Sequence, residues 1–263
     1  MPAPHRHQGN GTLLPGAGTS VPGRTSDNCV EPVQTVAGRT HCLIEHNHER
    51  NIQKLVKLKR YGSNPILSAD SARDWEANHV SNSAAVVKDG KVHLFYRAEG
   101  RDTRNSSQAW FVSRIGHAVS SDGFTIDCRY PEPALDILGE ELPFTDGVED
   151  PRIVEIDGVY HMVYCTTSVY PERLAWATSK DLITFDKHGI LMPDYSQRTA
   201  GLLPERIDGE YVLFHRILPH LWISRSRDMK EWHSSQVLVH SRQGHWTESK
   251  MGIGATPIKT EQA

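Results

Sequence analysis

The amino-acid sequence predicts an all-β protein built from repeated four-stranded antiparallel sheets, the blades of a β-propeller. Two observations carry this prediction. A hairpin template occurs three times, and a second template of a short strand and a turn follows each copy after a variable loop. Two hairpin-forming units per repeat make one four-stranded blade. The repeats span roughly 50 to 65 residues, which suits blades with long loops.

The hairpin template consists of an apolar run, an Asp-Gly step and a strand rich in aromatic and β-branched residues. Asp-Gly between two such runs is the strongest short-range signal for a β-hairpin, because both residues tolerate the positive φ of a tight turn. We therefore expect hairpins over residues 84–97, 153–165 and 205–216.

The second template places an aspartate after a short strand and before an aromatic residue. Its three copies contain Asp122, Asp181 and Asp228. A fourth repeat begins near Gly252 and reaches Ala263. Because a ring of blades closes only when its last blade meets its first, we expect the propeller to be incomplete at the C-terminal end of this sequence.

Composition separates the chain into two parts. Residues 1–45 are rich in Gly, Pro, Ser and Thr and show no periodicity, which predicts a disordered or loosely attached tail. Residues 46–263 form the predicted propeller domain. No apolar run approaches the ~18 residues of a membrane span, and the N-terminus has no apolar signal segment. We therefore expect a cytoplasmic protein.

Charge and cysteine content argue against several classes of partner. A net charge of -3 disfavours nucleic acid or an anionic membrane as the main partner. The four cysteines include no CxxC pair, and Cys165 is expected to be a small buried side chain in an apolar strand. His41, His46 and His48 are expected to belong to a solvated polar stretch. We expect no metal and no cofactor.

In a propeller, the innermost strand of every blade starts near the central axis, so residues at these starts converge however far apart they lie in sequence. This rule selects residues 81–83, 147–152, 203–206 and 250–254. Together they supply carboxylates, cations and amide donors, which make a sugar-binding site where they meet at one concave point.

The stretch 147–152 carries an adjacent acid pair. In an extended segment Glu149 and Asp150 point to opposite sides, so one can face a scissile bond while the other orients a substrate hydroxyl or an arginine. Pro151 is expected to hold Asp150 in an extended conformation, and Arg152 to lie on the side of Asp150. The alternative is a turn with a surface ion pair.

Arg97 and Arg216 occupy equivalent positions, seven residues after the glycine of their hairpins. With Lys250 they are expected to form an anion pocket for phosphate. Taken singly, each arginine is more typical of a solvated strand end. His215 and Arg216 are neighbours on a strand, so only one of the two is expected to reach the pocket.

Seven short motifs occur in order over about residues 61–260, and the most specific of them is GVEDPRI. They are 64–67 (NPIL), 81–86 (SNSAAV), 96–98 (YRA), 147–153 (GVEDPRI), 203–206 (LPER), 215–216 (HR) and 250–257 (KMGIGATP). In these motifs the sequence resembles glycoside hydrolase family 130, the inverting β-mannoside phosphorylases. The resemblance implies a five-bladed β-propeller.

The resemblance also implies a mechanism. Asp150 is the sole catalytic acid and donates a proton towards the glycosidic oxygen, while phosphate attacks the anomeric carbon from the opposite face and α-mannose 1-phosphate is released. One carboxylate suffices because phosphate is already nucleophilic, whereas an inverting hydrolase needs a second carboxylate to activate water. Phosphate is thus a co-substrate. The Asn82-Ser83 pair leans towards β-1,4-mannooligosaccharides or mannosyl-N-acetylglucosamine units.

The implied contacts form two groups, one for the β-mannoside and one for phosphate. The expected substrate-binding residues are Asn82, Ser83, Glu149, Glu205 and His215. The expected phosphate-binding residues are Arg97, Arg152, Arg198 and Lys250. Homo-oligomerisation or domain exchange is one way in which the ring of blades would be completed.

Three alternatives stay open. A β-mannosidase of the same fold would use water and need a second carboxylate such as Glu205, and the cations Arg97 and Lys250 argue against it. A furanosidase with three catalytic carboxylates has a similar Asp-Pro step, but the sequence contains no segment like WMNDPNG. An incomplete ring would also fit an inactive fragment or a non-catalytic carbohydrate-binding propeller.

Overall fold

The structure is a computed structural model, and it describes residues 59–101, 111–137, 145–168 and 171–258. The chain divides into two units at Lys57 and Leu58, and the described residues all belong to the second unit. The predicted tail over residues 1–45 and the histidines His41, His46 and His48 lie outside the described residues. Within the described ranges, no helix is long and apolar enough to cross a membrane.

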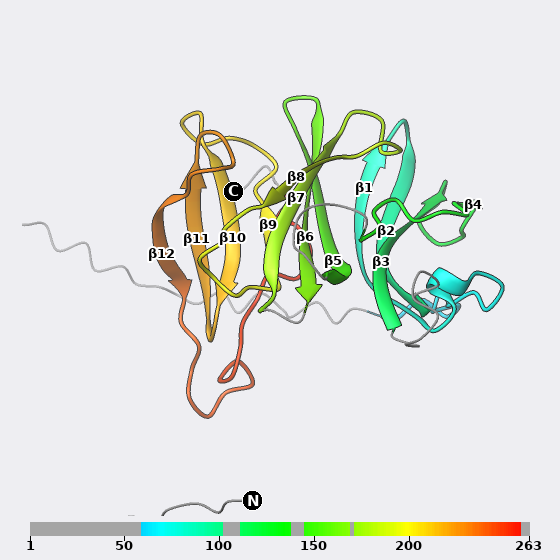
Figure 1. Cartoon of the computed structure of the whole chain (residues 1–263), viewed down its shortest axis with the longest axis horizontal. Helices are drawn as coiled ribbons and strands as arrows, with labels where there is room; N and C mark the ends of the chain where they lie inside the picture. The colour runs from blue at the N-terminus through cyan, green and yellow to red at the C-terminus, as the bar shows by residue number, and fades with distance from the viewer. Residues whose placement is uncertain (1–58, 102–110, 138–144, 169–170, 259–263) are drawn as a thin grey trace, which may run out of the picture. The chain divides into compact units, whose positions relative to one another are not determined.

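In the described residues, one short 3-10 helix precedes twelve strands (Figure 1). The helix is η1 (Asp74–Glu76). The strands are β1 (His79–Lys88), β2 (Lys91–Arg101), β3 (Phe111–Ser120), β4 (Cys128–Arg129), β5 (Thr145–Ile156), β6 (Val159–Ser168), β7 (Arg173–Ser179), β8 (Asp186–Ile190), β9 (Ala200–Leu202), β10 (Tyr211–Ile217), β11 (His220–Ser226) and β12 (His233–Val239). The all-β prediction is confirmed.

The strands form three antiparallel meanders, β1–β4, β5–β8 and β9–β12, which Figure 1 shows in sequence order. One parallel pair, Ser113 of β3 with Gly147 of β5, joins the first two meanders into one sheet. A Cβ on Gly147 would lie 2.9 Å from the Cβ of Ser113. Only glycine therefore allows the two strands to approach this closely.

The predicted Asp-Gly turns lie where the templates place them. Each turn leads into the second strand of its meander: β2, β6 or β10. All six residues have the positive φ that this kind of hairpin turn requires. The φ values are 51° for Asp89, 53° for Asp157, 54° for Asp208, 73° for Gly90, 77° for Gly158 and 78° for Gly209. The prediction of three Asp-Gly hairpins is confirmed.

The second template forms one repeated turn between the last two strands of each meander. In each copy the aspartate Oδ1 accepts backbone N–H bonds from the residues two and three positions later, over distances of 2.7 to 3.0 Å. A serine two positions earlier donates to the same oxygen. The backbone bonds lower the pKa of all three aspartates, and that of Asp122 to about 2.

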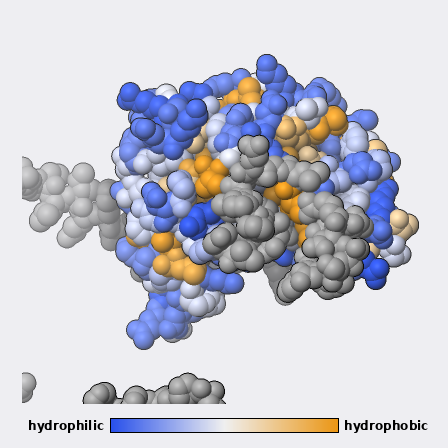
Figure 2. Space-filling model, in the orientation of Figure 1, coloured by the Kyte–Doolittle hydropathy of each residue, from blue (hydrophilic) through white to orange (hydrophobic). Residues whose placement is uncertain are grey.

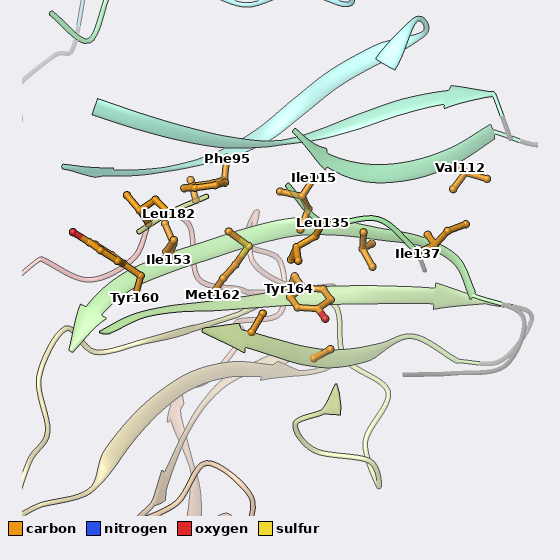
Figure 3. Packing of buried hydrophobic residues seen from close by; sticks show 14 residues of the cluster. Phe95, Val112, Ile115, Leu135, Ile137, Ile153, Tyr160, Met162, Tyr164 and Leu182 are labelled. Carbon is orange, nitrogen blue, oxygen red and sulfur yellow. The ribbon is translucent and has the colours of Figure 1, made fainter. Parts of the chain in front are cut away.

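Two apolar clusters hold the meanders together. Side chains of the first and second meanders, among them Phe95, Ile115 and Met162, point toward one another in Figure 3 and are buried. A second cluster, with Leu174 and Leu213, joins the second and third meanders. Each fully buried side chain of this size contributes about 1.5–3 kcal/mol. This packing brings β1 against β5 and β5 against β9, so the first strands of the meanders are neighbours.

The outer surface is more polar than these interfaces. Figure 2 shows a face on which hydrophilic residues dominate and hydrophobic patches lie between them near its middle. Exposed large apolar side chains in the described residues include Val87, Leu218, Trp246 and Ile258.

Candidate active site

The first strands of the first two meanders carry a β-bulge at equivalent positions. Pairing shifts between Ser81 and Ala84 in β1, and between Glu149 and Arg152 in β5. Ser81 pairs with Arg97 and Glu149 pairs with Cys165, the two residues that lie seven positions after their hairpin glycines. The next residues, Asn82 and Asp150, are therefore structural equivalents.

Asn82 and Asp150 both adopt a left-handed backbone, with φ of 47° and 56°. A positive φ in a non-glycine residue costs of order 1 kcal/mol, and such residues cluster at functional sites. The extended conformation that Pro151 was expected to impose on Asp150 is wrong. The bulge in β5 overrides the local preference, because it is set by pairing with β6.

The bulge also changes where the two adjacent carboxylates point. Glu149 Oε2 forms an ion pair with Nη1 of Arg97, and Asp150 Oδ1 lies 3.6 Å from the same nitrogen. The expectation that these side chains point to opposite sides is therefore wrong. Asn82 Nδ2 also donates a hydrogen bond of 2.7 Å to Asp150 Oδ1.

Glu149 is the buried centre of this charge cluster, with only 3% of its side chain exposed. Its Oε2 binds Arg97 on one side and Nη2 of Arg198, at 2.8 Å, on the other. Burial raises the pKa of Glu149, although the two arginines lower it in part. Arg97 also pairs with Glu99 at 2.5 Å, and Arg198 pairs with Glu172 at 3.3 Å. The charge of Arg97 is thus balanced by three surrounding carboxylates.

Arg216 has a different environment. It is half-buried on β10, and among the described residues it makes no ion pair with a carboxylate within 4.0 Å. Burial lowers its pKa, and the nearby positive charge of Arg198 lowers it further. A Cβ on Gly252 would lie 3.3 Å from Nη1 of Arg216. The segment 250–254 therefore passes directly beside this guanidinium.

Arg152 fastens the same segment to β5. Its Nε donates to the carbonyl oxygen of Gly254 at 2.5 Å, and its Nη1 donates to that of Pro151 at 2.7 Å. Burial lowers the pKa of Arg152, and the nearby negative charge of Asp150 offsets this in part. Lys250 is exposed and forms no ion pair with another described residue. Among the described cations, the unpaired Arg216 therefore interacts with the charge of Asp150 from the third meander, and the segment 250–254 lies beside Arg216.

His215 is placed differently from the expected sugar contact. It is fully buried, and its Nδ1 lies 2.8 Å from Gln197 Oε1 while its Nε2 lies 2.7 Å from Ser224 Oγ. Both ring nitrogens are thus occupied by protein partners. Glu205 lies in the segment that leads from β9 to the turn at Asp208 and Gly209. Its neighbour Arg206 pairs at 3.0 Å with Asp157, which follows the end of β5.

Two cavities adjoin the bulge in β1. One of about 590 Å³ is lined by Tyr61, Leu94 and Tyr96 together with Asn82. The other, of about 490 Å³, is lined by Arg152, Pro204 and Thr256. Ser83 borders both cavities. Space of the size that a sugar needs therefore lies beside the predicted contacts Asn82 and Ser83.

Some residues of this cluster carry no signal in the sequence. Glu172 and Gln197 lie outside both repeat templates, between β6 and β9, and only the folded structure brings them to Arg198 and His215. Glu99 lies on β2 two residues after Arg97, so the two side chains point to the same side of the strand. For Glu99, this spacing is the one sequence signal of a contact with Arg97.

The sequence and the fold both match known proteins. Residues 55–263 match the family described as β-1,4-mannooligosaccharide phosphorylase, glycoside hydrolase family 130. A 1,2-β-oligomannan phosphorylase of Thermoanaerobacter is 36% identical over 210 residues, which cover 79% of this chain and 69% of the relative. A β-1,2-mannobiose phosphorylase of the same organism is 37% identical over 215 residues, which cover 79% of this chain and 70% of the relative.

A solved structure from work on the glycoside hydrolases of the same family gives the third match. That work describes hydrolases that target β-1,2 mannosidic linkages in Candida mannan, within the GH130 family of mannoside phosphorylases. The structure aligns with a TM-score of 0.62 and 28% identity, covering 71% of this chain and 62% of that one. By the extent of the family match and the identity to both Thermoanaerobacter enzymes, the chain belongs to glycoside hydrolase family 130, the mannoside phosphorylase family.

Proposed function

We propose that this chain carries the catalytic face of a five-bladed β-propeller that cleaves β-mannosides with phosphate and releases α-mannose 1-phosphate. The observation that carries the proposal is the position of Asp150. Asp150 lies on a β-bulge with a left-handed backbone, and its carboxylate accepts a hydrogen bond from Asn82. The nearby cation Arg216 has no carboxylate partner among the described residues. The three four-stranded meanders, with their first strands adjacent, support the propeller.

In the proposed mechanism Asp150 is the general acid. Asn82 Nδ2 can only donate, so it holds Oδ1 as an acceptor and leaves the second carboxyl oxygen to carry the proton. This proton passes to the glycosidic oxygen as its bond to the anomeric carbon breaks. A phosphate oxygen forms the new bond from the opposite face, so the configuration inverts. Phosphate arrives as an anion and needs no general base.

The anion seat of this proposal consists of Arg198, Arg216 and Lys250. Arg198 and Arg216 repel each other, and an anion between them would relieve this repulsion. A guanidinium pair offers phosphate the planar, forked donors that it binds best. Arg97, expected from the sequence to hold phosphate, is instead assigned to Asp150, because three carboxylates already balance its charge. Arg152 holds the segment that carries Lys250.

The linkage of the substrate is proposed from the relatives. Both Thermoanaerobacter enzymes are named for β-1,2-linked mannosides and share 36% and 37% identity with this chain. These relatives do not favour the β-1,4 preference expected from Asn82 and Ser83, so β-1,2-mannobiose is the first substrate to test. The cytoplasmic location expected from the sequence stays a prediction.

Hydrolysis is the second candidate function, because the family includes hydrolases that target β-1,2 mannosidic linkages. An inverting hydrolase needs a second carboxylate about 6.5–9.5 Å from the acid. Glu149, the carboxylate next to Asp150, is buried between two arginines. This pairing favours phosphorolysis.

The test incubates the protein with β-1,2-mannobiose or β-1,4-mannobiose, each with and without inorganic phosphate. Products are followed by ³¹P NMR and by anion-exchange chromatography. We expect α-mannose 1-phosphate from the β-1,2 disaccharide, and only when phosphate is present. Free mannose released at the same rate without phosphate would replace the phosphorylase proposal with the hydrolase.

A further inference from the structure

A chain of hydrogen bonds crosses the third meander and ends beside the proposed anion seat, and it is buried except at Ser235, its exposed outer end. It runs from Gln197 Oε1 to His215 Nδ1 (2.8 Å), from His215 Nε2 to Ser224 Oγ (2.7 Å), and from Ser224 Oγ to Ser235 Oγ (2.7 Å). Gln197 is 2% exposed, and His215 and Ser224 are fully buried. A buried polar chain of this kind is retained only when every member is satisfied.

The donor and the acceptor of each bond follow from Gln197 Oε1, the atom at the inner end of the chain. The Oε1 atom of Gln197 can only accept, so His215 Nδ1 carries a hydrogen and Nε2 is an acceptor. Ser224 then donates to Nε2 and accepts from Ser235. Burial lowers the pKa of His215 to about 4, so the ring is neutral at neutral pH. The Nε2 of Gln197 faces Met192 Sδ at 3.6 Å, in accord with this orientation of the amide.

Gln197 fixes the segment that carries Arg198. Its backbone N–H donates to the carbonyl oxygen of Glu172 at 3.1 Å, and the Thr199 carbonyl accepts from the backbone N–H of Arg216 at 3.2 Å. These backbone bonds set the path of the segment, and the bond from His215 anchors it from the interior. A change at Gln197 or His215 therefore alters the spacing between Arg198 and Arg216.

We propose that Gln197 and His215 are positioning residues, which set the geometry of the anion seat through a buried hydrogen-bond chain and touch neither sugar nor phosphate. This inference rests on the proposed function, because it assigns a support to the phosphate site. It differs from the sequence-based expectation for His215, which placed the imidazole against the mannosyl unit.

The experiment compares three variants of the chain with a matched control. Gln197→Met keeps the length of the side chain and removes the acceptor for His215. Ser224→Ala removes the donor at the far side of the ring, and Ser224→Thr restores a hydroxyl. The control is His117→Phe. It removes the hydrogen bond of 3.0 Å between the buried His117 and His93, and the phenyl ring can keep the stacking of residue 117 on Phe95 and Tyr130. The control lies in the first meander.

Two quantities are measured for each protein: the Kd for inorganic phosphate by calorimetry, and the KM values for phosphate and mannoside. We expect Gln197→Met to raise the phosphate Kd and KM by about tenfold, the effect of losing one anchoring hydrogen bond, and to leave the mannoside KM within about twofold. Ser224→Ala should raise them by about threefold, and Ser224→Thr should restore them. His117→Phe should change neither.

Unchanged phosphate affinity in Gln197→Met and Ser224→Ala, with a melting temperature lowered as in His117→Phe, would overturn the inference and leave the proposed function intact. Absence of phosphate binding by the wild-type protein would instead remove the proposed function, and the inference with it. If Gln197→Met does not fold, as judged by near-ultraviolet circular dichroism, the Ser224 pair decides the question alone.

Discussion

Asn82 Nδ2 donates a hydrogen bond of 2.7 Å to Oδ1 of Asp150, across the boundary between the first and second meanders. The two residues occupy equivalent bulges and share a left-handed backbone, with φ of 47° and 56°. An amide in one repeat thus fixes the carboxylate at the same place in the next repeat. In the proposed mechanism this bond connects the repeat architecture to the chemistry, because it leaves the second carboxyl oxygen of Asp150 to face the substrate.

Replacing Asp150 by Asn tests the acid. Asn tolerates a positive φ as well as Asp does and can still accept the bond from Asn82, but it has no proton to donate. We expect kcat for phosphorolysis to fall by about 100-fold or more, with an unchanged melting temperature.

A matched control for this variant is Asp157→Asn. Asp157 lies in the turn after β5, with φ of 53°, and Asn-Gly forms the same turn as Asp-Gly. Its activity should equal that of the wild type. Full activity in Asp150→Asn would show that the acid assignment is mistaken.

Paired substitutions of Asn82 separate its hydrogen bond from its backbone strain. Both Asn82→Ala and Asn82→Gly lose the bond to Asp150, so both should lose about tenfold in kcat/KM. In Asn82→Ala, the alanine must adopt a left-handed backbone without a polar side chain that could hydrogen-bond locally. This costs about 1 kcal/mol of unfolding free energy relative to glycine. Urea denaturation measures the second effect. Equal stability of the two variants would contradict the strained backbone at this bulge.

Replacing Arg216 by Met tests the anion seat. We expect the KM for phosphate to rise at least about tenfold, with little change in the KM for the mannoside. Arg225 on the neighbouring strand β11 is the matched control, because it pairs loosely with Asp208 and Glu210, at 3.9 and 3.8 Å, near the hairpin turn. Arg225→Met should leave both constants unchanged. Equal effects of the two substitutions would place phosphate elsewhere.

Replacing Glu149 by Gln separates function from stability. Burial raises the pKa of Glu149 in spite of two arginines, so the charged carboxylate is kept in the site at an energetic cost. We expect Glu149→Gln to lose at least about tenfold in kcat/KM, because the amide oxygen can still accept from Arg97 and Arg198 but no longer carries the negative charge that holds both. Its melting temperature should remain close to that of the wild type. A large loss of stability with normal kinetics would identify Glu149 as a purely structural residue.

The repeats could be predicted from the sequence, because their signals are local. An Asp-Gly turn is decided by the φ preferences of two residues, and Asp89, Asp157 and Asp208 each form the expected turn. The repeated aspartate turns depend on bonds that reach only three residues along the chain. The prediction that strand starts converge also agrees with the contact between Asn82 and Asp150.

The directions of the side chains in the site could not be predicted in the same way. Pro151 favours an extended Asp150 locally, but the register between β5 and β6 places a bulge there. This one shift brings Glu149 and Asp150 to the same arginine. The burial of His215 depends on Gln197 and Ser224, which lie on different segments. Long-range pairing decides such contacts, and a single sequence does not reveal it.

The three turn aspartates predict how stability changes in acid. Backbone N–H bonds lower the pKa of Asp122 to about 2 and lower those of Asp181 and Asp228, against an ordinary value near 3.9 in an unfolded chain. A lowered folded-state pKa stabilises the protein above the unfolded value, and this stabilisation is lost as the pH falls through the folded value. We therefore expect the melting temperature to drop between about pH 4 and pH 2.

The measurement compares the wild type with the triple variant Asp122→Asn, Asp181→Asn and Asp228→Asn. An asparagine Oδ1 accepts the same backbone bonds without titrating, so the turns should persist. The variant should be less stable than the wild type at pH 6, because it loses the charge-assisted bonds, and its melting temperature should fall less between pH 4 and pH 2. Parallel curves for the two proteins over this range would mean that other carboxylates control the acid transition.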